Sequence, residues 1–177
     1  MTNPTELHPD ELLLRAIKSL PGWYGHLEDA SDFSGRSAGA RTIGAIISSI
    51  LLAAGEEEPP VAVNGRVEDT GHGYLYVVYP DFMVTVVASR LRENNASYET
   101  RLRFFADARD LRVQTKHSYY DGTDTYPRHR GFTFSFTIDG ERLELAPSHW
   151  SPAGNELVRD DAVYAAFEAV RSWMVRR

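Results

Sequence analysis

Three arginines on two neighbouring predicted strands offer the most specific chemistry in this sequence. When the apolar residues of strands 98–105 and 111–119 are kept on one face, Arg103 lies directly opposite Arg112. This register aligns Leu102 with Val113, Phe104 with Leu111, Arg101 with Gln114 and Glu99 with Lys116. Like charges that face each other disfavour strand pairing unless an anion or an acid intervenes, and guanidinium groups suit carboxylate and phosphate. The pattern therefore predicts an anion-binding face made by Arg101, Arg103 and Arg112, with a solvated face balanced by acids of the next strand as the alternative.

A second candidate is the polar segment 116–130, which is rich in aromatic and basic side chains. Tyrosine and arginine dominate the energetics of binding surfaces, and long loops often carry contacts to partners. The candidate contact residues are Tyr119, Tyr120, Tyr126, Arg128, His129 and Arg130. The alternative interpretation is a solvated hairpin tip. Asp121 and Asp124 lie near His117 and His129, but neither a zinc-like histidine spacing nor an acidic calcium loop is present, so we expect no metal site.

Residues 35–39 match the G-x-S-x-G pattern of a nucleophile elbow, with Ser37 at the nucleophile position. That chemistry requires a buried strand before the turn, and residues 28–34 do not form one. The chain also lacks the alternating strands and helices of a hydrolase, so we expect a protein that is not an enzyme and has no cofactor. Arg36 and Arg41 flank the same stretch, which is therefore either an anion site at a helix start or simply a helix entry.

Composition limits the classes of protein to which the chain can belong. Its 177 residues suit one domain, and a net charge of -6 argues against general nucleic-acid binding. The absence of cysteine excludes disulfides and thiolate chemistry and favours the cytoplasm. Residues 1–9 do not resemble a secretory signal, and the apolar run 42–54 is too short to span a bilayer, so we expect no transmembrane segment.

Helical periodicity predicts three helices, over about 9–20, 38–54 and 161–175. In the second, apolar residues recur at helical spacing on one face, at Ile43, Ile46, Ile47, Ile50 and Leu51. Its other surface carries few strongly polar residues, so we expect it to be covered on more than one side, by its own sheet or by a second subunit. Self-association through Ile43, Ile46, Ile47 and Ile50 is one hypothesis that follows.

From residue 61 the periodicity changes to two, which predicts seven strands. They lie near 61–68, 73–79, 82–91, 98–105, 111–119, 131–138 and 141–146. Asp139-Gly140 favours a two-residue hairpin turn between the last two strands. That turn pairs Ile138 with Glu141, Phe136 with Leu143 and Phe134 with Leu145, which agrees with the apolar pattern.

Seven antiparallel strands followed by an amphipathic helix resemble the pleckstrin-homology-like (PH-like) fold in its bacterial versions. The resemblance covers about 61–174 and rests on the order of the elements, on the 131–145 hairpin and on the final helix. It implies an α+β fold with a bent sheet or partial barrel closed by a C-terminal helix, preceded by a helical extension, 1–60, as one compact unit with 61–177. It does not imply phosphoinositide binding, because the first hairpin offers only Arg66 and His72 as basic residues.

These patterns predict a non-enzymatic binding or adaptor domain that recognises a protein partner or an anionic ligand. One alternative is a helix-grip carrier or enzyme, in which the final helix closes a curved sheet over an apolar cavity. The other is a structural protein that self-associates through the 38–54 helix.

Overall fold

The computed structural model describes residues 8–23, 25, 38–55, 58–91, 93–115, 132–147 and 156–176. In chain order its elements are α1 (Pro9–Lys18), α3 (Ala38–Ala54), β1 (Ala62–Val67), β2 (Gly73–Val78), β3 (Phe82–Ser89), β4 (Ser97–Phe104), the 3-10 helix η1 (Phe105–Asp107), β5 (Arg109–Thr115), β6 (Phe132–Ile138), β7 (Glu141–Leu145) and α4 (Glu156–Val175). The α+β class and the order of elements are confirmed. Among the described helices, none is both long and apolar enough to cross a membrane.

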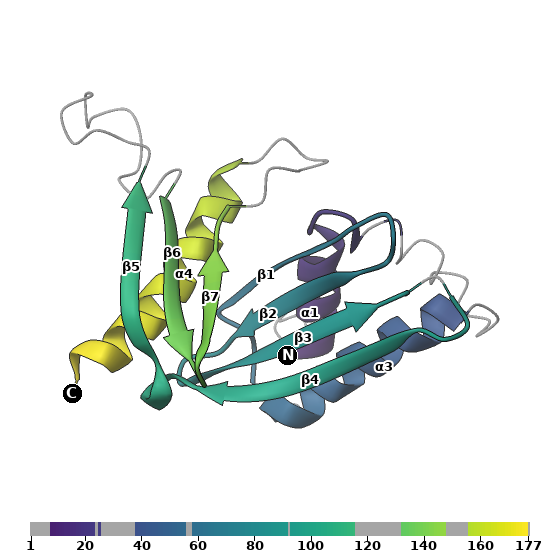
Figure 1. The fold of residues 1–177 in the computed structure, drawn as a ribbon, viewed down its shortest axis with the longest axis horizontal. Helices are drawn as coiled ribbons and strands as arrows, with labels where there is room; N and C mark the ends of the chain where they lie inside the picture. Colours follow the sequence, from purple (N-terminus) through teal and green to yellow (C-terminus); the bar gives the residue numbers. More distant parts are fainter. Residues whose placement is uncertain are drawn as a thin grey trace, which may run out of the picture.

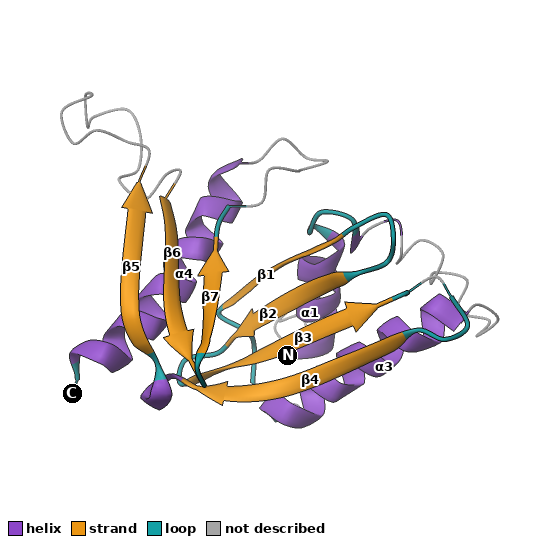
Figure 2. Ribbon diagram, in the orientation of Figure 1, coloured by secondary structure: helices purple, strands orange, loops and turns teal. Residues whose placement is uncertain are grey.

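The strands form two antiparallel sheets that do not close into a barrel (Figure 1). The first sheet has the order β1-β2-β3-β4, and the second has the order β5-β6-β7. Figure 2 shows the two sheets meeting at an angle near the end of β4, where η1 leads into β5. The strands β1 and β4 are therefore the two edges of the first sheet.

The helices α1 and α3 cover one face of the first sheet and form the first core with it. Side chains that alternate along the strands, such as Leu75 and Val77 in β2, belong to the same buried cluster as Leu13 and Ile17 of α1. The periodicity of α3 supplies Ile43, Ile46 and Ile50 to the same core, where all three are buried. Ile47 packs partly against it. The hypothesis of self-association through these isoleucines is therefore corrected, because the chain's own sheet occupies the surface that they would offer.

The opposite face of the first sheet joins the second sheet and α4 in a second core. Met83 and Val78 contribute from the first sheet, beside Val163 and Val170 of α4. The ring of Phe167 lies 5.2 Å from that of Phe132 and 5.6 Å from that of Phe134, in edge-to-face geometry. The space between α4 and β6 is thus filled by aromatic rings, which argues against a helix-grip cavity there. The helix α4 begins at Glu156, five residues before the predicted start.

The hairpin between β6 and β7 has the predicted register. Phe134 pairs with Leu145, Phe136 with Leu143, and Ile138 with Glu141. Asp139 and Gly140 both adopt positive φ, at 52° and 77°, as a two-residue hairpin turn requires. Turn chemistry and apolar alternation therefore determined this register together.

The predicted pairing of the strands containing Arg103 and Arg112 is wrong. Arg103 in β4 lies opposite Met83 of β3, whereas Arg112 in β5 lies opposite Ser135 of β6. The chain turns a corner at η1, where Phe105 is buried and packs edge-to-face on Phe136. This buried ring directs β5 into the second sheet, so β4 and β5 do not pair.

Candidate functional site

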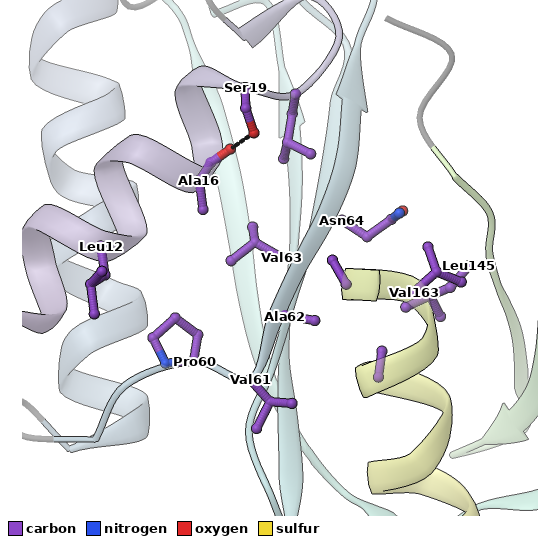
Figure 3. Close-up of a pocket in the computed structure, with 13 residues that line it drawn as sticks. Leu12, Ala16, Ser19, Pro60, Val61, Ala62, Val63, Asn64, Leu145 and Val163 are labelled. Atoms are coloured by element: carbon purple, nitrogen blue, oxygen red, sulfur yellow. Dashed lines mark hydrogen bonds between the residues drawn. The ribbon is translucent and has the colours of Figure 1, made fainter. Parts of the chain in front are cut away.

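A groove lies between α1 and α4, and β1 forms its floor (Figure 3). Its volume is about 260 Å³, and most of the side chains that line it are apolar. They are Leu12, Ala16, Ser19 and Leu20 of α1 and its C-terminal end, Pro60 to Asn64 of β1 and the residues before it, Leu145 of β7, and Ala162, Val163 and Ala166 of α4. Alanines at positions 162 and 166 share one face of α4, and their small side chains keep this space open.

The floor of the groove is the open edge of a sheet. At the end of β1, the Glu68 amide donates a hydrogen bond to the His72 carbonyl at 2.8 Å. Because bonded pairs alternate along an antiparallel ladder, even-numbered residues of β1 bond β2, and odd-numbered residues turn their N–H and C=O groups outward. The Val67 amide follows this rule, since it donates outward to the Pro21 carbonyl at 3.0 Å. Val63 and Gly65 therefore present main-chain donors and acceptors along the edge.

The segment after α1 occupies the far end of this edge. Gly22 has a φ of 78°, and a Cβ atom there would lie 1.8 Å from the Val67 carbonyl oxygen. Only glycine allows this approach, and the Pro21 and Gly22 backbone thus covers the edge at Val67. No described main-chain group outside β2 bonds Val63 or Gly65. The uncovered edge at Val63 lies in the groove, whereas Gly65 is buried and does not line it.

The side chains in the groove are suited to binding and carry no reactive group. The Asn64 amide donates to the Ala146 carbonyl at 2.8 Å, and the Ser19 hydroxyl donates to the Ala16 carbonyl at 2.7 Å. Both polar side chains are thus bonded within the chain, and no acid, base or thiol lines the groove. Within the described ranges, no group of three or more metal-ligating side chains gathers.

The predicted arginines are not brought together as an opposed pair. Arg103 is 4% exposed, and its guanidinium donates to the Thr85 hydroxyl at 3.2 Å and to the Ile138 carbonyl at 3.2 Å. It also donates to the Glu141 carboxylate, and Asp139 lies 3.7 Å away. This guanidinium is already neutralised and bonded inside the chain, which removes the charge conflict that motivated an anion site.

The other two arginines lie in different surroundings. Arg101 is exposed and donates to the Glu99 carboxylate at 2.7 Å, and this hydrogen bond lowers the pKa of Glu99. Arg112 is exposed on β5, in the other sheet. An anion would therefore meet Arg101 already paired and Arg103 buried.

Several candidates from the sequence lie outside the described residues. These are the contact residues Tyr119, Tyr120, Tyr126, Arg128, His129 and Arg130, and the G-x-S-x-G serine, Ser37. Their roles stay predictions.

Sequence reasoning missed the groove. Its walls come from the two ends of the chain, and β1 carries no polar motif that would mark it. The available signals were the paired alanines of α4 and Pro60 before β1, and neither identifies a site without the fold.

Comparison of the chain with protein-family models, with curated proteins and with solved structures finds no match.

Proposed function

We propose that this chain is a non-catalytic binding module that takes an extended apolar segment of a protein partner into the groove between α1 and α4. The segment would add as a strand beside β1. The observation that carries the proposal is that Val63, whose N–H and C=O turn outward from the edge strand β1, lies at the floor of an apolar groove. Strand addition takes its affinity from main-chain hydrogen bonds and its specificity from pockets for alternate side chains.

The choice of a protein segment over an anionic ligand follows from the charges. Arg103 is bonded to Glu141, and Arg101 is bonded to Glu99, so neither guanidinium is available to an anion without loss of an ion pair. The groove offers an incoming chain the outward N–H and C=O of Val63 and apolar walls, which suit a peptide with alternating apolar residues.

The PH-like resemblance remains part of the proposal. A sheet of four strands, a sheet of three strands and a C-terminal helix that packs on both is the arrangement that such a fold would have. A cytoplasmic location is likewise proposed, on the absence of cysteine.

A displayed library of random eight-residue peptides would test this function, with selection on the wild-type chain. Peptides with alternating apolar residues should be recovered. Ala162→Leu, which fills the groove, should weaken their binding by about tenfold or more. Ala165→Leu is the matched control, because Ala165 lies on α4 but does not line the groove, and it should bind as the wild type does.

Val63→Pro tests the main-chain contacts separately. Proline is tolerated on edge strands, and at this position it removes an outward N–H while the bonds of Ala62 and Asn64 to β2 remain. The variant should lose the peptides, whereas Val63→Ala should keep them. Recovery of no peptide, or equal binding to Ala162→Leu and Ala165→Leu, would overturn the proposal.

A further inference from the structure

We propose that the chain forms a symmetric dimer in which β4 pairs antiparallel with β4 of a second copy, with the two-fold axis at Thr100. This surface is the opposite edge of the first sheet from the β1 groove, and the inference does not depend on the proposed function.

One row of main-chain groups on the eight residues of β4 has no backbone partner among the described residues. The Phe105 amide donates to the Asp81 carbonyl at 3.1 Å, which fixes the alternation along the β3–β4 ladder. Odd-numbered residues of β4 therefore bond β3, and even-numbered residues turn their N–H and C=O groups outward. The outward residues are Tyr98, Thr100, Leu102 and Phe104.

Three of these four residues also have apolar side chains that are exposed to solvent. Tyr98 is 36% exposed, Leu102 is 40% exposed and Phe104 is 51% exposed. Soluble proteins usually protect such an edge with proline, charged side chains (lysine above all) or a very short strand. The strand β4 has no proline or lysine, carries charges only at Glu99, Arg101 and Arg103, and is one of the two longest strands described. A long edge strand with one exposed apolar face is a surface for pairing with another strand.

The charged residues of β4 favour a second copy of the chain as the partner, and they favour one register of the strand pair. With the axis at Thr100, the Glu99–Arg101 ion pair of one copy lies antiparallel to the same pair of the second copy, so each Glu99 also faces the Arg101 of the other copy. Tyr98 then faces Leu102 of the second copy. Opposite charges and apolar residues that face each other stabilise a strand pair. An axis at Arg101 would instead place two arginines face to face, and an axis at Glu99 would do the same with two glutamates. Only the Thr100 register complements itself in charge.

The helix beside this edge has a surface that accommodates a copy of itself. The Ser49 hydroxyl of α3 lies 2.8 Å from the Thr100 hydroxyl, so α3 passes directly beside the proposed axis. A two-fold axis perpendicular to the sheet would bring two α3 helices together on the same face. The exposed side of α3 carries Gly44 and Ser48 together with Arg41 and Leu52, and a Cβ atom at Gly44 would meet nothing within 4 Å. Small residues allow two helix backbones to approach closely.

Sedimentation velocity of the full chain over a range of micromolar concentrations tests the dimer. The wild type should shift from monomer to dimer as concentration rises. Leu102→Lys, which places a charge on the open edge, should weaken the dimer by about tenfold or more. Val113→Lys is the matched control on the exposed part of β5 and should leave association unchanged.

A charge exchange tests the register. Glu99→Arg and Arg101→Glu should each weaken the dimer by about tenfold, because each places like charges opposite each other. The double variant should restore wild-type association, since it re-forms both pairs with the signs reversed. A wild type that stays monomeric at every concentration would overturn the proposal. So would a dimer that is indifferent to Leu102→Lys, or single variants that the exchange does not rescue.

Discussion

At the residue scale, Arg103 joins the two sheets. It leaves β4 of the first sheet and bonds the Ile138 carbonyl and the Glu141 carboxylate at the turn between β6 and β7. A buried guanidinium is tolerated only when its donors are bonded and its charge is balanced. Here both conditions are met by groups of three strands, β3, β6 and β7, and of the turn between β6 and β7. The arginine therefore has a structural role.

We expect Glu141→Gln to lower the free energy of unfolding by about 1 to 3 kcal/mol, because it leaves the buried charge of Arg103 less well balanced. The cost is below that of a fully buried pair, since Glu141 itself is 51% exposed. Urea unfolding measures it. Glu144→Gln is the control on the same strand and should change stability by less than about 0.5 kcal/mol. Equal losses in the two variants would contradict the structural role of Arg103.

Tyr79 supplies a second prediction at this scale. Its ring is buried and stacks on Phe82 with centroids 4.8 Å apart, and its hydroxyl has no hydrogen-bond partner among the described residues. An unpaired buried hydroxyl is costly, so Tyr79→Phe should leave stability unchanged or raise it by about 1 kcal/mol. Tyr79→Leu, which also removes the stacked ring, should be less stable. A clear loss of stability in Tyr79→Phe, measured by thermal unfolding, would mean that the hydroxyl is bonded in solution.

At the element scale, α3 shows how an almost wholly apolar helix is used. Its isoleucines at helical spacing enter the first core, while Ser49 lies beside the β4 edge. Sequence periodicity located the buried face but not the element that covers it, because an intramolecular sheet and a second subunit require the same pattern.

Two substitutions in α3 compare a residue buried in the first core with a residue exposed on the helix surface. Ile46→Ala should cost about 2 to 5 kcal/mol in unfolding free energy, because Ile46 is fully buried in the core. Leu52→Ala should cost less than about 1 kcal/mol, since Leu52 is 75% exposed. Denaturant unfolding at a concentration where the chain is monomeric gives both values. Similar losses would show that Leu52 is also covered.

At the scale of the whole molecule, the first sheet is shared by two cores. Neighbouring residues of one strand serve both, as Val77 faces α1 and α3 while Val78 faces α4 and the second sheet. Each core therefore depends on the same four strands.

Alkaline pH should lower the stability of both cores, because a tyrosine with a raised pKa packs in or against each of them. Burial raises the pKa of Tyr76, which packs against the second core, to about 12, and it raises the pKa of Tyr79 in the first core to about 12. Between the ordinary value of 10.0 and about 12, these tyrosines lose protons in the unfolded chain but keep them in the folded chain. Their contribution to stability is therefore complete below pH 10 and is lost above it.

The expected loss is at most about 1.4 kcal/mol per pH unit for each of the two groups across this window. Urea unfolding at a series of alkaline pH values measures the slope, and Tyr76→Phe should reduce it. A free energy of unfolding that stays constant above pH 10, or the same slope in Tyr76→Phe, would show that these phenols ionise normally in the folded chain.

The sequence by itself determined the elements and one register. Apolar periodicity located the three described helices and all seven strands, and Asp139-Gly140 fixed the last hairpin. These features depend on neighbours within a few residues, which a linear pattern records. The tertiary structure alone decided that β4 and β5 separate at η1, that Arg103 meets Glu141, and that α1 and α4 flank the open edge of β1. Each of these joins residues far apart in the chain, and local propensity carries no information about which distant surface will cover a given apolar or charged side chain.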